Sequence, residues 1–223
     1  MCGIFGAENS SKFETLYDIN KVRGTFAFGS VTVTPSEHYL IHKQEGIVNF
    51  NEFSMDYDTR YITGHTQAPT SCERKYADHT SHPFEAGEWM VAHNGIISNF
   101  SDLKKEHAPW HSNKVDSSII PTLLNEFYSN SPDMEPLQIT SVISKVLSML
   151  KGTFAVWILN RETSNIYIAR SGSTLFFDKD RVAFSSIECM DWEPVQEGII
   201  YQYTIEGFTQ VGTFDCDHPF FIL

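Results

Sequence analysis

Short apolar segments rich in β-branched and aromatic residues recur along the chain, separated by polar and glycine-containing stretches. Runs of this length and composition are typical of strands, and their near-continuous apolar character indicates burial on both faces of a sheet. The predicted strands are Gly3–Gly6, Thr25–Thr34, His38–His42, Tyr61–Thr66, Trp89–His93, Thr153–Leu159, Ile166–Ala169, Thr174–Phe177 and Ile199–Thr204.

Two segments in the middle of the chain have helical periodicity instead. Apolar residues spaced three or four apart predict one buried stripe on each helix: Ile119, Ile120, Leu123, Leu124 and Phe127, then Ile139, Val142, Ile143, Val146, Leu147 and Leu150. Asp116 or Ser117 is the candidate N-cap of the first helix. A weaker pattern predicts a third helix over Asn99–Glu106. Strands followed by helices and then strands again indicate an α+β layered sandwich and not a βαβ alternation.

Length and charge limit the classes of function. The 223 residues suffice for one well-filled domain. The 28 acidic residues outnumber the 16 basic ones, giving a formal net charge of −12. A nucleic-acid or anionic-membrane surface needs clustered Lys and Arg, so neither partner is expected.

The four cysteines, Cys2, Cys72, Cys189 and Cys216, include no CxxC pair. With no leader pattern and no apolar run of membrane-spanning length, we expect a cytoplasmic protein with reduced thiols, or a host-cytoplasmic one if the source is viral. The sequence contains no dinucleotide fingerprint, phosphate-binding loop or zinc framework, so no cofactor and no metal are expected.

The candidate nucleophile is Cys2, which follows the initiator methionine and precedes Gly3. Removal of Met1 would leave Cys2 with a free α-amine, which titrates near pH ~8 and can serve as a base for the thiol of the same residue. The alternative is an ordinary buried cysteine at the start of a strand.

The opening Met-Cys-Gly-Ile-Phe-Gly resembles the start of the class II glutamine amidotransferases, a family of N-terminal nucleophile enzymes. The motifs along the chain are most similar to the glutaminase domain of glucosamine-6-phosphate synthase. The resemblance implies a four-layer αββα sandwich of the N-terminal nucleophile hydrolase type, with residues 1–223 forming one domain. It also implies L-glutamine as the substrate and an ammonia-accepting synthase as the partner.

The strongest internal match is His93-Asn94-Gly95, which ends an apolar strand and resembles the family's HNGxIxN signature. An Asn-Gly pair alone can be just a turn. In the family context, the Asn94 amide and the Gly95 N–H are expected to bind the oxyanion formed on the substrate carboxamide.

Further matches assign candidate substrate-binding residues. Arg23 lies in a Val-Arg-Gly segment similar to the family's RGxDSxG, although it could be a solvated loop charge. Gln67 and Thr70 belong to a segment resembling GHTRWAT, and His82 to one resembling (A/S)HPF. Asp116 matches the aspartate that receives the substrate α-ammonium. His82 with His79 suggests a metal pair, but no further ligands are suitably spaced, so a structural histidine is favoured.

The main departure from the family pattern is Gln67, which replaces the arginine expected to bind the substrate carboxylate. A neutral amide cannot form the bidentate charged pair, and Arg74 or Lys75 could supply the charge instead. Three functions therefore remain: a glutaminase delivering ammonia to an acceptor on a separate protein, a thiol hydrolase of another γ-glutamyl or small amide, and a catalytically silent binding or regulatory relative.

Overall fold

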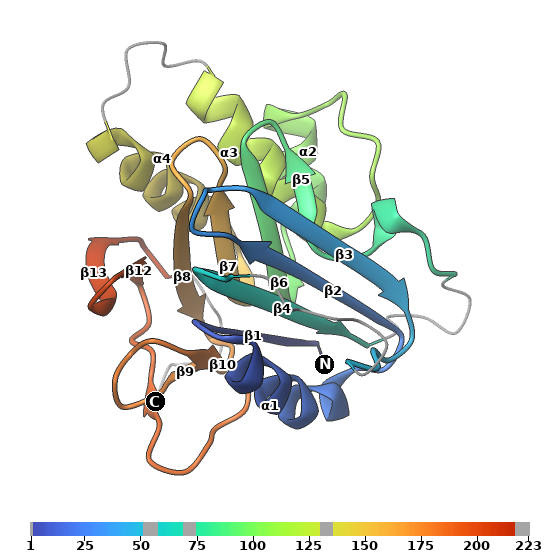
Figure 1. Ribbon diagram of the computed structural model, residues 1–223. Coiled ribbons are helices and arrows are strands. Elements are labelled where there is room, and N and C mark those ends of the chain that lie inside the picture. Colours follow the sequence, from blue (N-terminus) through green and yellow to red (C-terminus); the bar gives the residue numbers. More distant parts are fainter. Residues whose placement is uncertain (1, 51–57, 69–74, 130–135, 217–223) are drawn as a thin grey trace, which may run out of the picture. The chain divides into compact units, whose positions relative to one another are not determined.

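The computed structural model describes residues 2–50, 58–68, 75–129 and 136–216, and the chain forms two compact units. The first unit contains Met1–Pro83 and Thr174–Pro194, and the second contains Phe84–Ser173 and Val195–Leu223. Each unit has one sheet and its own helices, as the α+β prediction requires (Figure 1). Chain order does not separate the units, because the segment from residue 174 returns to the first sheet.

The first unit has a seven-stranded antiparallel sheet in the order β11-β9-β10-β1-β4-β2-β3. Its strands are β1 (Gly3–Ala7), β2 (Ala27–Val33), β3 (Tyr39–Glu45), β4 (Tyr61–Gln67), β9 (Phe176–Phe177), β10 (Phe184–Ser185) and β11 (Glu193–Pro194). Every residue of β1, β2 and β4 is buried, as predicted for strands covered on both faces. The prediction is wrong for β3, where Leu40 and Ile41 are 40% and 41% exposed, because β3 is an edge strand.

Helix α1 (Ser10–Asn20) in the first unit was not predicted from the sequence. Its buried face consists of Phe13, Leu16, Tyr17 and the polar Asn20, so the apolar stripe is too short to stand out. Two 3-10 turns complete the unit, over Lys21–Arg23 and Asp78–Thr80. The Phe5 ring from β1 packs against Phe13, with ring centroids 5.1 Å apart, so the helix covers the strand that follows Cys2.

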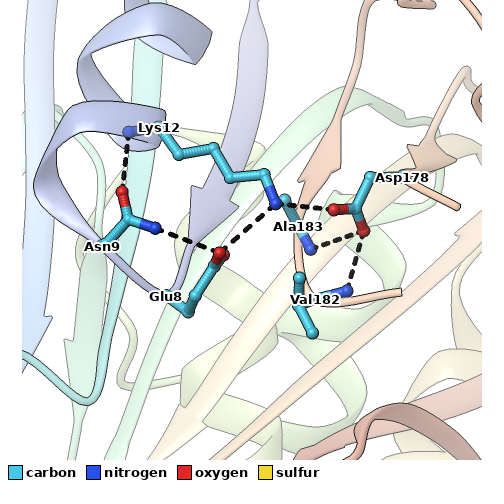
Figure 2. A network of polar contacts seen from close by, with 6 residues as sticks. All are labelled: Glu8, Asn9, Lys12, Asp178, Val182 and Ala183. Atoms are coloured by element: carbon cyan, nitrogen blue, oxygen red, sulfur yellow. Dashed lines mark hydrogen bonds and ion pairs between the residues drawn. The ribbon is translucent and has the colours of Figure 1, made fainter. Parts of the chain in front are cut away.

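A polar network ties the start of α1 to the turn between β9 and β10 (Figure 2). Lys12 Nζ lies 2.7 Å from Asp178 Oδ2 and 3.3 Å from Glu8 Oε1. The other oxygen of Asp178 accepts hydrogen bonds from the backbone N–H groups of Val182 at 2.8 Å and Ala183 at 2.9 Å. Because the Asp178 side chain is only 8% exposed, its charge depends on these partners.

The second unit has a six-stranded antiparallel sheet in the order β13-β12-β8-β7-β6-β5. Its strands are β5 (Phe84–Ala86), β6 (Trp89–Ile97), β7 (Gly152–Asn160), β8 (Asn165–Ser171), β12 (Ile199–Thr204) and β13 (Gly207–Thr213). Its helices are α2 (Phe100–His107), α3 (Ile119–Ser129) and α4 (Pro136–Met149), with a 3-10 turn over Asp116–Ser118. The three predicted helices are confirmed.

One hydrophobic cluster joins the three helices to the sheet of this unit. All six stripe residues predicted around α4 are buried, as are four of the five on α3, and Phe127 is partly buried against the same cluster. The predicted N-cap is wrong, because Asp116 and Ser117 belong to the 3-10 turn before α3. The Asp116 carboxylate accepts from the N–H groups of Ser117 and Ile97 instead.

Strands β6 and β7 approach each other closely at Gly95, which pairs with Phe154. Gly95 has a φ of +146°, a conformation that side-chain-bearing residues rarely adopt. A Cβ at this position would collide with the backbone oxygen of Thr153. Glycine is therefore required here by the sheet itself. In the part of the chain that the structure describes, no helix is long and apolar enough to cross a membrane.

Replacing Lys12 with Met should lower the free energy of unfolding by about 1–2 kcal/mol, because Asp178 keeps its charge but loses its cation. Chemical denaturation measures this difference. Lys21→Met is the matched control, since it removes an exposed pair with Asp18 at 2.6 Å, and it should leave the midpoint almost unchanged. Equal effects of the two substitutions would contradict the role given to the network.

The pH dependence of this difference has a defined sign. Burial alone would lower the pKa of Lys12, but Asp178 and Glu8 together raise it above the usual 10.5. A raised pKa in the folded state means that the stabilisation is fully present below pH 10.5 and is lost as the pH rises through the higher folded value. The gap between wild type and Lys12→Met should therefore close only at strongly alkaline pH.

Replacing Gly95 with Ala should destabilise the second unit by about 2–4 kcal/mol, because the new methyl meets the Thr153 oxygen and the backbone conformation is strained. The control is Gly46→Ala, since Gly46 has a φ of +78° but nothing lies within 4 Å of the added methyl. That change should cost only about 1 kcal/mol. Thermal denaturation compares the two, and an equal loss would show that steric overlap at Gly95 is unimportant.

Candidate active site

Cys2 immediately precedes strand β1, and the pairing of β1 limits how far Cys2 can move. Strand β1 lies between β4 and β10 in the sheet, so both of its edges are paired. The Ile4 N–H donates to Ser186 Oγ at 3.0 Å, and the Ser186 N–H donates to the Ile4 carbonyl at 2.8 Å. Cys2 is partly buried. Within the described part of the chain, Cys2, Cys189 and Cys216 are free cysteines. The Cys2 backbone thus adjoins a doubly anchored strand.

The space next to Cys2 is occupied closely, which accounts for Gly3. A Cβ on Gly3 would lie 2.7 Å from Thr66 Oγ1 and 3.0 Å from Asn20 Oδ1. These neighbours are themselves fixed, since Thr66 Oγ1 donates to the Asn20 carbonyl at 3.0 Å and Asn20 Nδ2 donates to Ser185 Oγ at 2.9 Å. A side chain at position 3 would displace this buried polar cluster.

Arg23 is anchored by hydrogen bonds to Ser186 and Thr174 and is not a solvated loop charge. Its Nη1 donates to the Ser186 carbonyl at 2.7 Å and to Thr174 Oγ1 at 3.2 Å. Burial lowers the pKa of Arg23, while the charge of a Cys2 thiolate acts in the opposite direction. The guanidinium therefore lies close enough to interact electrostatically with the sulfur. A neighbouring cation favours the thiolate, which is the nucleophilic form of cysteine.

Gln67 and His82 pack inside the first unit. The Gln67 side chain is 1% exposed overall, and its Nε2 donates to the Thr80 carbonyl at 3.5 Å. The His82 ring stacks on the ring of His65 with centroids 3.8 Å apart.

Across the described residues, no group of three His, Cys, Asp or Glu side chains is arranged to hold a metal ion. Thr70 and Arg74 lie outside the described residues, and Lys75 is exposed.

The His-Asn-Gly segment lies near the end of β6 in the second unit. Successive residues of a strand face opposite sides of the sheet. His93 lies on the side of the 3-10 turn, where its Nδ1 is 2.8 Å from Ser117 Oγ, so Asn94 faces the other side. Both side chains are buried, and Gly95 is exposed. Two consecutive side chains of the motif, His93 and Asn94, therefore lie on opposite faces of the sheet.

Asp116 is partly buried and is fixed to β6 two residues beyond Gly95. Its Oδ2 accepts from the Ile97 N–H at 2.9 Å, and its Oδ1 accepts from the Ser117 N–H at 2.9 Å. Burial lowers the pKa of His93, although the Asp116 carboxylate and the Thr153 carbonyl favour its charged form. We take the imidazole as neutral near pH 7.

The predicted site residues thus fall into two groups. In the first unit, Cys2 and Arg23 interact electrostatically. The backbone of Gln67 lies against Gly24, and Thr66 before it pairs with Gly3, whereas the His82 ring stacks on His65. In the second unit, the Asn94-Gly95 segment and Asp116 are joined through Ile97. Sequence reasoning missed Ser186 and Thr174 around Arg23, and Ser117 between Asp116 and His93. Ser186 is separated from Ile4 by 182 positions, so no local pattern marks it.

Comparison with known proteins identifies relatives of this chain. A family model described as a glutamine amidotransferase domain matches residues 72–189, more than half of the chain. The 7-cyano-7-deazaguanine synthase 2 of Sulfurisphaera tokodaii is 27% identical over 208 residues, covering 84% of this chain and 44% of that protein. A glutamine–fructose-6-phosphate aminotransferase (isomerizing) of Staphylococcus aureus is 29% identical over 185 residues, covering 78% of this chain and 30% of that protein. The chain spans less than half the length of these curated relatives.

Among solved structures, the glutamine phosphoribosylpyrophosphate amidotransferase of B. subtilis, complexed with ADP and GMP, matches with a TM-score of 0.72. The match covers 94% of this chain and 48% of that chain at 22% identity. At this identity the likeness concerns the fold, and it confirms the predicted α+β fold of the N-terminal nucleophile type. On the family match, the chain belongs to the glutamine amidotransferase domain family, among the class II, N-terminal nucleophile amidotransferases, which are enzymes that hydrolyse glutamine.

Proposed function

We propose that this chain performs the glutaminase half-reaction, with Cys2 as the nucleophile after removal of Met1. The α-amine takes the thiol proton, and the sulfur attacks the γ-carboxamide carbon of L-glutamine to form a tetrahedral oxyanion. The C–N bond then breaks, and the leaving nitrogen takes a proton from the α-ammonium to leave as ammonia. Water, deprotonated by the same amine, hydrolyses the thioester to release glutamate and restore Cys2.

The observation that carries this proposal is the position of Cys2 immediately before a strand that is anchored on both edges. Proximity of nucleophile and substrate accelerates a reaction only when the nucleophile is held in a defined position. The bonds between Ile4 and Ser186 limit the movement of the strand. The positive charge of the Arg23 guanidinium interacts electrostatically with the sulfur, which favours the thiolate.

The second unit supplies the proposed oxyanion and ammonium sites. We assign oxyanion binding to the Asn94 amide and the Gly95 N–H, because a preorganised donor is typically worth about 10²–10³ in rate. We assign the substrate α-ammonium to Asp116, whose carboxylate is partly exposed and already oriented by backbone donors.

We further propose that the ammonia passes to an acceptor on a separate protein. The named relatives are a synthase and an aminotransferase, and each is more than twice as long as the part that this chain matches. An acceptor activity is therefore associated with such domains. A cytoplasmic location, where glutamine is abundant and thiols are reduced, suits this reaction.

Gln67 favours a second candidate, a thiol hydrolase acting on another γ-glutamyl or small amide. Its buried amide donates to the Thr80 carbonyl, and this leaves the usual carboxylate-binding charge unassigned at that position. Such a charge-assisted pair is worth roughly 1.5–3 kcal/mol, which corresponds to about one to two orders of magnitude in affinity. A catalytically silent relative is the third possibility.

Steady-state ammonia release from L-glutamine and from a panel of other amides tests these candidates together. We expect L-glutamine to be preferred, and Cys2→Ala to reduce its turnover by more than about 10³-fold, because the nucleophile is gone. Cys189→Ala is the matched control, a partly buried thiol of the same unit, and should retain wild-type turnover.

A different preferred amide, with activity still dependent on Cys2, would support the second candidate. No ammonia from any amide would support the silent relative. Full activity in Cys2→Ala would overturn the proposed chemistry.

A further inference from the structure

A short relay of side chains connects strand β6 to the carboxylate that we assign to the substrate ammonium. Ser117 Oγ lies 2.8 Å from His93 Nδ1 and 3.4 Å from Asp116 Oδ1. His93 and Ser117 are both buried, at 2% and 3% exposure. The side chains of His93 and Ser117 are therefore shielded from water, which strengthens the hydrogen bond between them.

The bonding of Asp116 leaves room for one more donor. An ionised carboxylate offers about four acceptor directions. The donors that reach it from the described residues are the Ile97 N–H, the Ser117 N–H and the Ser117 hydroxyl. The remaining direction suits a primary ammonium group.

The Ser117 hydroxyl needs a second partner in order to keep its orientation. A serine hydroxyl rotates freely unless it is bonded on both sides. The neutral His93 ring supplies this second contact from β6, because burial disfavours its protonated form. In the proposed relay its single proton is on Nδ1 and is donated to Ser117 Oγ, so that the Ser117 hydroxyl donates its own proton to Asp116. The histidine of the His-Asn-Gly motif thus contacts the Asp116 turn, whereas Asn94 faces the opposite side of the sheet.

We propose that Ser117, held by His93, is a positioning residue that orients the Asp116 carboxylate and so determines selectivity for amides that carry an α-ammonium group. This inference rests on the proposed function. An oriented carboxylate loses less rotational freedom when it binds an ammonium, so affinity for that group increases. In this proposal the relay affects binding of the α-ammonium group and not binding of the reacting amide at the other end of the substrate.

The adjacent serine provides a matched control. Ser118 is 4% exposed and belongs to the same 3-10 turn, but its Oγ donates to the Val115 carbonyl at 2.6 Å and contacts His111 Nε2 at 2.8 Å. Ser118→Ala therefore removes a buried hydroxyl bonded to a histidine without touching the Asp116 relay. Ser117→Ala makes the same chemical change within the relay.

The test measures binding by titration calorimetry to the full chain carrying Cys2→Ala, so that no turnover occurs. The two ligands are L-glutamine and glutaramate, which is glutamine without its α-amino group. We expect Ser117→Ala to weaken L-glutamine binding by about three- to tenfold, as for one lost hydrogen bond, and to leave glutaramate binding unchanged. Ser118→Ala should change neither, and Ser117→Thr should restore L-glutamine binding.

Nitrogen-15 NMR of the histidine side chains gives an independent readout. Ser117→Ala should shift the Nδ1 resonance of His93, and Ser118→Ala should instead shift that of His111 Nε2. Equal weakening of both ligands by Ser117→Ala, or an unchanged L-glutamine affinity, would overturn the positioning role.

The outcomes also separate this inference from the proposed function. If the chain with intact Cys2 releases no ammonia but Ser117→Ala still weakens L-glutamine binding selectively, hydrolysis fails and the positioning role stands. If glutamine is hydrolysed normally and Ser117→Ala leaves glutamine binding intact, only the positioning role is removed.

Discussion

The first strand of the chain has to be fixed on both edges, because the proposed nucleophile is the residue immediately before it. In the proposed mature chain Cys2 is the terminal residue, and a terminus is ordinarily poorly ordered unless it is tied down. Here β4 and β10 pair with β1, and Ser186 bonds to both the N–H and the carbonyl of Ile4. The segment from residue 174 returns to the first sheet and supplies β10 and Ser186, so the end of β1 is secured by residues far away in the sequence.

The same returning segment orients the charge near the sulfur. Thr174 and Ser186 together hold the Arg23 guanidinium, and Ser185 holds Asn20, which packs against Gly3. Substitutions of Thr174, Ser185 or Ser186 would therefore alter the surroundings of Cys2. In the second unit, His93 and Asn94 point to opposite faces of β6, so one motif contributes to the Asp116 turn and to the proposed oxyanion site.

Local spacing was sufficient to predict helices α2, α3 and α4 of the second unit. The stripe from Ile139 to Leu150 is buried as predicted, because helical periodicity depends only on neighbouring residues. Helix α1 was not predicted because its buried apolar stripe is short, and the exposure of β3 was not predicted because edge position depends on the whole sheet. Among the candidate site residues, the sequence indicated Cys2, Asn94, Gly95 and Asp116 through their motifs. It gave no sign of Ser186, and it indicated Ser117 only as a candidate N-cap, because the partners of both serines are set by tertiary contacts.

The central claim is that one residue supplies both the nucleophilic sulfur and the amine that moves its proton. Intact-mass measurement and peptide mapping of the purified, active chain, before and after treatment with the glutamine-mimicking electrophile 6-diazo-5-oxo-L-norleucine, test this most directly. The account predicts a mature protein without Met1 and a single adduct on Cys2. An active chain that retains Met1, or an adduct on Cys72, Cys189 or Cys216, would contradict it.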